Sequence, residues 1–215
     1  MAKKAFYHEV VGPTRNLLLR AAENVCVEPD YNDVVSLAKY AAFAAYHFRE
    51  KVLRKSPNDK LAPMTDTTAE VLRQRLGDVV DSAKHGPLRD PDRDTTFRAC
   101  LAFEYDESQG FRFLRTEVLA KNNRSGEFEL SDTILEFVLL LGAEMHITWN
   151  PEEIEFPSHS FLDWAETYLT PKSGFDIPSV GIRTYKGDAN KTLIPFDLPE
   201  IKFRVMELVS PDPSS

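Results

Sequence analysis

Apolar residues recur every three or four positions through the first 85 residues, which predicts helices rather than strands. A first helix is expected to begin near Pro13 and to end before Pro29, because proline suits the first turn of a helix and also stops one. A third helix is expected to begin with the capping pair Thr67 and Glu70 and to end at Gly86.

The second predicted helix, which Asp30, Asn32 or Asp33 can cap and which runs towards Lys55, has apolar side chains on two sides. One stripe is rich in alanine: Val34, Ala38, Ala41, Ala45, Phe48 and Val52. The opposite stripe is aromatic and comprises Tyr40, Phe43 and His47. A helix with two apolar sides lies either at the centre of its domain or at a subunit interface. We therefore expect a homodimer through the aromatic stripe, with coverage by later elements of the same chain as the alternative.

At Thr95 the spacing of apolar residues changes to two, which predicts strands. A half-buried strand over residues 96–105 is expected to form a hairpin with a strand over 111–120, followed by a short strand over 127–130. A helix opening with Thr133 and Glu136 is apolar nearly all round and is therefore expected to be buried.

Six prolines between Pro151 and Pro199 interrupt the pattern of the last part of the chain. The expected elements there are a short helix over 161–169, a hairpin of strands over 180–185 and 192–196, and a strand over 201–209.

This order of elements indicates an α+β fold: an N-terminal helical bundle, an antiparallel β-meander, a buried helix and short C-terminal strands. We expect residues 1–150 to form a helical domain with inserted β-hairpins. Residues 151–215 are expected to be a proline-rich extension of short strands, packed on that domain as one compact unit.

The net charge of −8 argues against a general nucleic-acid coat but leaves room for a local basic patch. Cys26 and Cys100 form no CxxC pair, which favours small core residues in a reducing compartment. The first residues do not have the pattern of a signal peptide, and no apolar run is long enough to span a bilayer. A cytoplasmic protein without membrane contact is expected.

The end of the third predicted helix is the main candidate for chemistry. Asp78, Asp81 and His85 share one face, which the helical wheel turns away from the apolar face. Asp81 could orient His85 for acid–base catalysis, while Lys84 or Arg89 holds a phosphate. The alternative is an exposed polar face whose cations complement the helix dipole. Two acids and one histidine leave too few ligands for a closed metal site, so no metal or other cofactor is expected.

Two further groups are binding candidates. Arg112 and Arg115 alternate with phenylalanines, a pattern that binds single-stranded nucleic acid, unless the phenylalanines face the core and Arg112 faces water. His47 is either a binding residue or a histidine packed in a core or a helix interface. Near the C-terminal part, Trp149, His159 and Trp164 could line a small-molecule pocket.

The stretch DVVDSAKHG at residues 78–86, which follows the alanine-rich AKYAAFAAYHF, resembles the HEPN superfamily of bacterial helical proteins. The resemblance covers residues 13–147, where VLAKNNRSGEFELSDTILEFVLLLGAEM corresponds to the closing hairpin and last helix. HEPN ribonucleases carry an arginine followed by a histidine a few residues later, whereas the nearest pair here, Arg75 and His85, is ten positions apart.

The resemblance therefore implies a non-catalytic HEPN-like binding or accessory protein of bacterial origin, with a protein partner, in a defence or toxin–antitoxin setting. A metal-independent ribonuclease or nucleotide-processing enzyme that uses His85, with RNA or a nucleotide as substrate, is the second hypothesis. A small-molecule sensor is the third.

Overall fold

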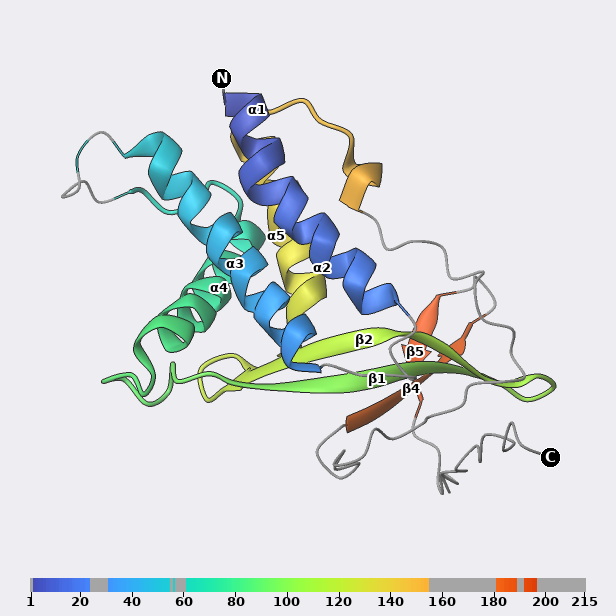
Figure 1. Ribbon diagram of the computed structural model, residues 1–215. Helices are drawn as coiled ribbons and strands as arrows, with labels where there is room; N and C mark the ends of the chain where they lie inside the picture. Colours follow the sequence, from blue (N-terminus) through green and yellow to red (C-terminus); the bar gives the residue numbers. More distant parts are fainter. Residues whose placement is uncertain are drawn as a thin grey trace, which may run out of the picture.

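The computed structural model describes residues 2–23, 31–54, 56, 61–154, 181–188 and 192–196. In these parts of the chain, helices pack on one side of a long β-hairpin that belongs to a five-stranded sheet (Figure 1). The α+β class and its N-terminal helical region are thus confirmed. No helix in the described ranges has both the length and the apolar character needed to cross a membrane.

The first helical segment begins well before its predicted start. It consists of α1 (Ala2–Phe6), the π-helical turn η1 (Tyr7–Val11) and α2 (Gly12–Ala22). A start near Pro13 is therefore wrong. Pro13 has no N–H to donate, and its ring crowds the preceding turn. The wider π-helical turn η1, which ends at Val11, accommodates both effects.

Helix α3 (Tyr31–Leu53) is central, as its two apolar stripes predict. The alanine-rich stripe is buried except for Val52, which lies on the last turn. Its small side chains face neighbouring helices on several sides, because α3 contacts α2, α4 and α5. On the aromatic stripe, Tyr40 is 60% exposed and Phe43 is 40% exposed.

Helix α4 (Thr67–His85) is capped one residue earlier than predicted. The Asp66 side chain accepts a hydrogen bond from the backbone N–H of Ala69 at 2.9 Å. Glu70 accepts one from the N–H of Met64 at 3.0 Å, so Thr67 is not the cap. The predicted end at Gly86 is confirmed, since this residue has a φ of +65°, which suits glycine.

The sheet has the order β3-β2-β1-β4-β5. Its strands are β1 (Thr96–Asp106), β2 (Gly110–Asn122), β3 (Gly126–Glu129), β4 (Gly181–Gly187) and β5 (Leu193–Pro195). The predicted meander of β1, β2 and β3 and the predicted β4–β5 hairpin are confirmed. The two parts join because β4 pairs in parallel with β1, a pairing that the local pattern did not indicate.

The centre of β1 is buried on both faces, so the half-buried strand predicted from alternation is wrong there. One face packs on the helices, through residues such as Val118 and Ala120 of the paired strand. On the other face, the buried carboxylate of Glu117 accepts hydrogen bonds from Tyr185 at 2.9 Å and Arg183 at 2.8 Å. These bonds tie β4 to the hairpin.

Helix α5 (Leu130–Glu144) begins at Leu130 and is capped by the side chain of Glu129, so the predicted opening at Thr133 is wrong. The Thr133 hydroxyl instead donates to the carbonyl of Glu129 at 2.7 Å. One side of α5 is fully buried, whereas Leu139 on the other side is exposed. The expectation of burial all round thus holds for one side only. The 3₁₀ turn η2 (Pro151–Ile154) follows.

Cys100 is a buried free thiol, as predicted for a core cysteine, and burial raises its pKa. Several predictions lie outside the described residues: those for Cys26, His159 and Trp164, the helix over 161–169 and the strand over 201–209.

Replacing Gly142 with alanine is expected to destabilise the protein. A Cβ at this position would lie 2.4 Å from Nε1 of Trp149, which requires the indole or the helix to shift. Glycine to alanine in a helix ordinarily stabilises by about 1 kcal/mol, whereas here we expect a loss of about 1–3 kcal/mol. Urea unfolding measures the difference. The cost should fall in the Trp149→Ala background, and an equal cost in both backgrounds would contradict the clash.

The stability of the protein is expected to fall with rising pH because of Glu129. Burial raises the pKa of its carboxyl from 4.5 to about 7, and the nearby Asp132 carboxylate adds to this effect. A raised pKa in the folded state means that the contribution of Glu129 is complete below pH 4.5 and is lost as the pH rises through about 7.

Glu129→Gln keeps an oxygen that can cap α5 but removes the charge. We expect its free energy of unfolding to fall less than that of the unmodified protein between about pH 5 and pH 8. Glu127→Gln, at an exposed position of β3, is the control. Parallel pH profiles for Glu129→Gln and the unmodified protein would show that Glu129 is not the titrating group.

Candidate functional site

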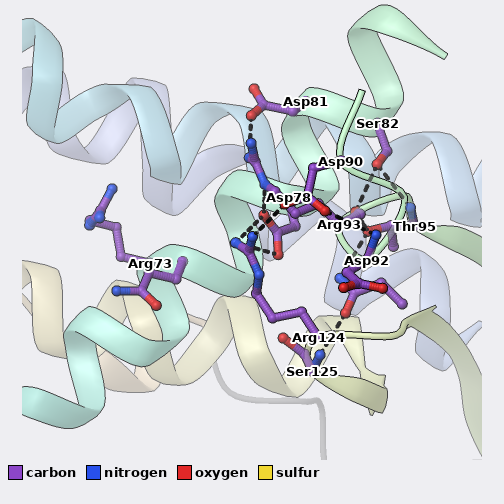
Figure 2. Close-up of polar contacts among 12 residues, drawn as sticks. Arg73, Asp78, Asp81, Ser82, Asp90, Asp92, Arg93, Thr95, Arg124 and Ser125 are labelled. Carbon is purple, nitrogen blue, oxygen red and sulfur yellow. Dashed lines mark hydrogen bonds and ion pairs between the residues drawn. The ribbon is translucent and has the colours of Figure 1, made fainter. Parts of the chain in front are cut away.

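The predicted acidic residues of α4 belong to a network of ion pairs centred on Asp78, which is only 1% exposed (Figure 2). Arg93 donates through Nε to Asp78 at 2.6 Å and through Nη2 to Asp81 at 2.5 Å. Arg124 donates to Asp78 at 3.3 Å and to Asp90 at 2.9 Å. Two guanidinium groups therefore compensate the buried carboxylate.

Backbone hydrogen bonds hold these arginines in place. The Ser82 hydroxyl donates to the carbonyl of Arg93 at 3.3 Å and accepts from the N–H of Thr95 at 2.9 Å. The N–H of Arg124 donates to the carbonyl of Asp92 at 2.9 Å. The network thus joins the second half of α4, the loop over residues 86–95 and the turn between β2 and β3.

This arrangement corrects part of the predicted site. Asp78 is buried, so the expectation that it lies on the outward face is wrong. Asp81 bonds to Arg93, and no hydrogen bond or ion pair in the described part of the chain joins it to His85, which is exposed at the last residue of α4. No group of three or more potential metal ligands occurs in the described ranges. An acid–base role for His85 stays a prediction.

The structure brings His47 and Lys84 together, although they are far apart in the sequence. Nδ1 of His47 lies 3.0 Å from Oε2 of Glu50, and Nε2 lies 2.8 Å from Nζ of Lys84. Since a charged lysine can only donate, Nε2 accepts from Lys84 and Nδ1 carries the proton that Glu50 accepts. Nζ of Lys84 also lies 4.5 Å from the ring centre of Phe43.

A cavity of about 350 Å³ lies beside this group. We call it the arginine pocket; its lining residues are Tyr46, Arg49, Glu50, Arg54, Leu61 and Arg73. Glu50 belongs both to the pocket and to the His47 group, and the rings of Tyr46 and His47 are 5.1 Å apart. The pocket and the exposed aromatic stripe are therefore neighbouring parts of one α3–α4 face.

Arg49 is the most firmly held residue of the arginine pocket, with a side chain that is only 7% exposed. Its Nε and Nη2 atoms donate to Glu144 of α5 at 3.1 and 3.0 Å. Nη2 also donates to the carbonyl of Ala62 at 2.9 Å. These bonds attach α3 to α5 and to the segment before α4, and they fix the guanidinium plane.

Arg73 and Arg54 complete the positive lining. Arg73 forms a two-pronged pair with Glu70, with distances of 2.8 and 2.7 Å, which lowers the pKa of that carboxyl to about 2. Arg54 donates to Glu50 at 3.1 Å and is partly exposed. The pKa of the Tyr46 hydroxyl is raised, mainly by burial, so it stays protonated at neutral pH.

The remaining candidates lie elsewhere. Arg112 pairs with Glu104, and Arg115 pairs with Glu117 and Asp132 at 3.2 Å each. Both arginines belong to β2, and their ion-pair partners lie in the sheet and, for Asp132, in α5. Arg89 is exposed in the loop after α4 and forms no ion pair with the described residues. Nucleic-acid binding by these residues stays a prediction.

The arginine pocket was not predicted from the sequence. The pairs Glu50–Arg54 and Glu70–Arg73 have the spacing of neighbours on a helix, which is a visible signal. No local pattern indicates that the two pairs face one cavity, because this depends on how α3 crosses α4.

Comparisons with protein-family models, curated proteins and solved structures found no match for this chain. The geometry of the α3–α4 face therefore carries the functional argument.

Asp78→Ala is expected to lower the free energy of unfolding by about 2–4 kcal/mol, because it leaves two guanidinium groups without their shared buried partner. Asp81→Ala removes a more exposed partner of the same Arg93 and should cost about 1 kcal/mol or less. Urea unfolding of both variants at neutral pH tests this difference. Equal losses would show that the buried carboxylate is not the centre of the network.

Proposed function

We propose that this protein is a HEPN-like binding protein that acts by contact through the α3–α4 face and not by catalysis. The observation that carries the proposal is the exposure of two large aromatic side chains, Tyr40 and Phe43, on a helix that is otherwise central to the core. Aromatic residues are enriched in the buried centres of protein interfaces. Lys84, stacked on Phe43, adds a cation at the edge of the same surface.

A second copy of this chain is the partner that fits this face best. A two-fold interface brings one surface against itself, so it requires charges of both signs on that surface. Lys84 supplies the positive charge, while Glu50 and the partly exposed Asp81 supply the negative charge. In a two-fold pair, the ring of Phe43 would be buried between such charges.

The setting that we propose follows from the resemblance stated above: a bacterial cytoplasmic protein that assists a partner protein in a defence or toxin–antitoxin system. The buried free thiol of Cys100 supports a reducing compartment. The non-catalytic role is consistent with the engagement of the Asp81 carboxylate by Arg93.

The native protein is expected to have the mass of a dimer in light scattering, and Phe43→Glu is expected to give a folded monomer. Placing a carboxylate at the centre of an apolar interface costs its desolvation in both copies. Leu19→Glu is the matched control, since Leu19 of α2 is exposed to a similar extent and should leave the dimer intact.

Two outcomes would contradict self-association. One is a native mass of a single chain at the highest concentration measured. The other is a Phe43→Glu variant that loses its circular dichroism signal while Leu19→Glu keeps it, since this would show that the aromatic stripe is covered within one subunit.

A further inference from the structure

The arginine pocket brings three guanidinium groups to one cavity, in a protein whose net charge is −8. Among the described lining residues, three are arginines and one, Glu50, is acidic. Glu70 and Glu144 pair with Arg73 and Arg49 but are not part of the lining. Each guanidinium group is thus already paired with a carboxylate, and what the described lining offers to an anion is guanidinium N–H donors rather than an excess of positive charge.

The ion pairs do not use all the donors of these arginines. Among the described residues, Arg49 bonds through Nε and Nη2, and Arg54 bonds through Nη2. Within the described part of the chain, Nη1 of Arg49 and both Nε and Nη1 of Arg54 have no hydrogen-bond acceptor, so we assign them to the ligand. A guanidinium group has five N–H donors, so it can hold its carboxylate partner and a second anion together.

The pocket is also organised before any ligand binds. The side chain of Arg49 is more than nine-tenths buried and is held by Glu144 and the carbonyl of Ala62. Arg73 is held by its two-pronged pair with Glu70. Side chains that are already fixed lose little entropy when they bind, which favours affinity.

We propose that the arginine pocket binds the phosphate group of a small phosphomonoester. One guanidinium fork is enough for the two oxygens of a carboxylate, whereas donors from three arginines around one cavity suit the terminal oxygens of a phosphomonoester. A volume of about 350 Å³ is at the lower end for ligand pockets, which suits a sugar phosphate or a mononucleotide. Tyr46 and Leu61 supply the apolar wall for the organic part.

The experiment is isothermal titration calorimetry on the full chain in a phosphate-free buffer of low ionic strength. AMP and ribose 5-phosphate are the probes, and adenosine and inorganic phosphate are the comparison compounds. We expect one molecule of either phosphomonoester to bind per chain, with weaker binding of inorganic phosphate and no binding of adenosine.

Arg54→Gln should lower the affinity for AMP about tenfold, the effect of losing one hydrogen bond between charged groups. Its side chain is partly exposed and pairs only with Glu50 among the described residues, so the variant should fold, which circular dichroism checks. Arg98→Gln on β1 removes the same charge from an exposed position that pairs with Glu127, and its affinity should be unchanged.

Several results would overturn the proposal. Absence of binding by both phosphomonoesters would do so, as would binding of adenosine as tight as that of AMP. Inorganic phosphate that binds as tightly as the phosphomonoesters would show that the organic part is not recognised. Equal losses in Arg54→Gln and Arg98→Gln would show that only the overall charge matters. Titrating Phe43→Glu with AMP separates this proposal from self-association, because that variant keeps every described residue of the pocket lining.

Discussion

The buried carboxylate of Asp78 is the constraint on which the arrangement of the α3–α4 face depends. A charged side chain with 1% exposure requires partners of opposite charge, and no cation of α4 forms an ion pair with Asp78. Its partners come from the loop that follows α4 and from the β2–β3 turn. The end of α4 is thereby fixed relative to the sheet, and with it the position of Lys84 beside His47.

The packing of α3 determines the rest of that face. Ala38, Ala41 and Ala45 are fully buried and occupy little space, so several helices can approach α3 at once. Tyr46 packs against Gly77 of α4, where an added Cβ would lie 3.1 Å from its ring. This close approach brings the arginines of α3 and the Glu70–Arg73 pair of α4 to the same cavity.

Local patterns predicted the elements better than their ends or their contacts. The spacing of apolar residues predicted α3, the β1–β2 hairpin and the β4–β5 hairpin, because each depends on interactions between near neighbours in the chain. Helix starts were wrong where another residue caps more effectively, as Glu129 does for α5. The parallel pairing of β4 with β1 and the convergence of Arg93 and Arg124 on Asp78 depend on distant segments. No local pattern carries that information.

Arg49 shows how stability and the proposed recognition of a phosphate group would be connected in this protein. Its guanidinium group attaches α3 to α5 through Glu144 and to the segment before α4 through Ala62. The same group forms part of the arginine pocket, so any change at Arg49 alters the fold and the pocket together. Lysine cannot replace it, since a single ammonium group lacks the planar fork that reaches both acceptors and a ligand. Arg54, partly exposed and paired only with its neighbour Glu50 in the described part of the chain, is the position where the two roles separate.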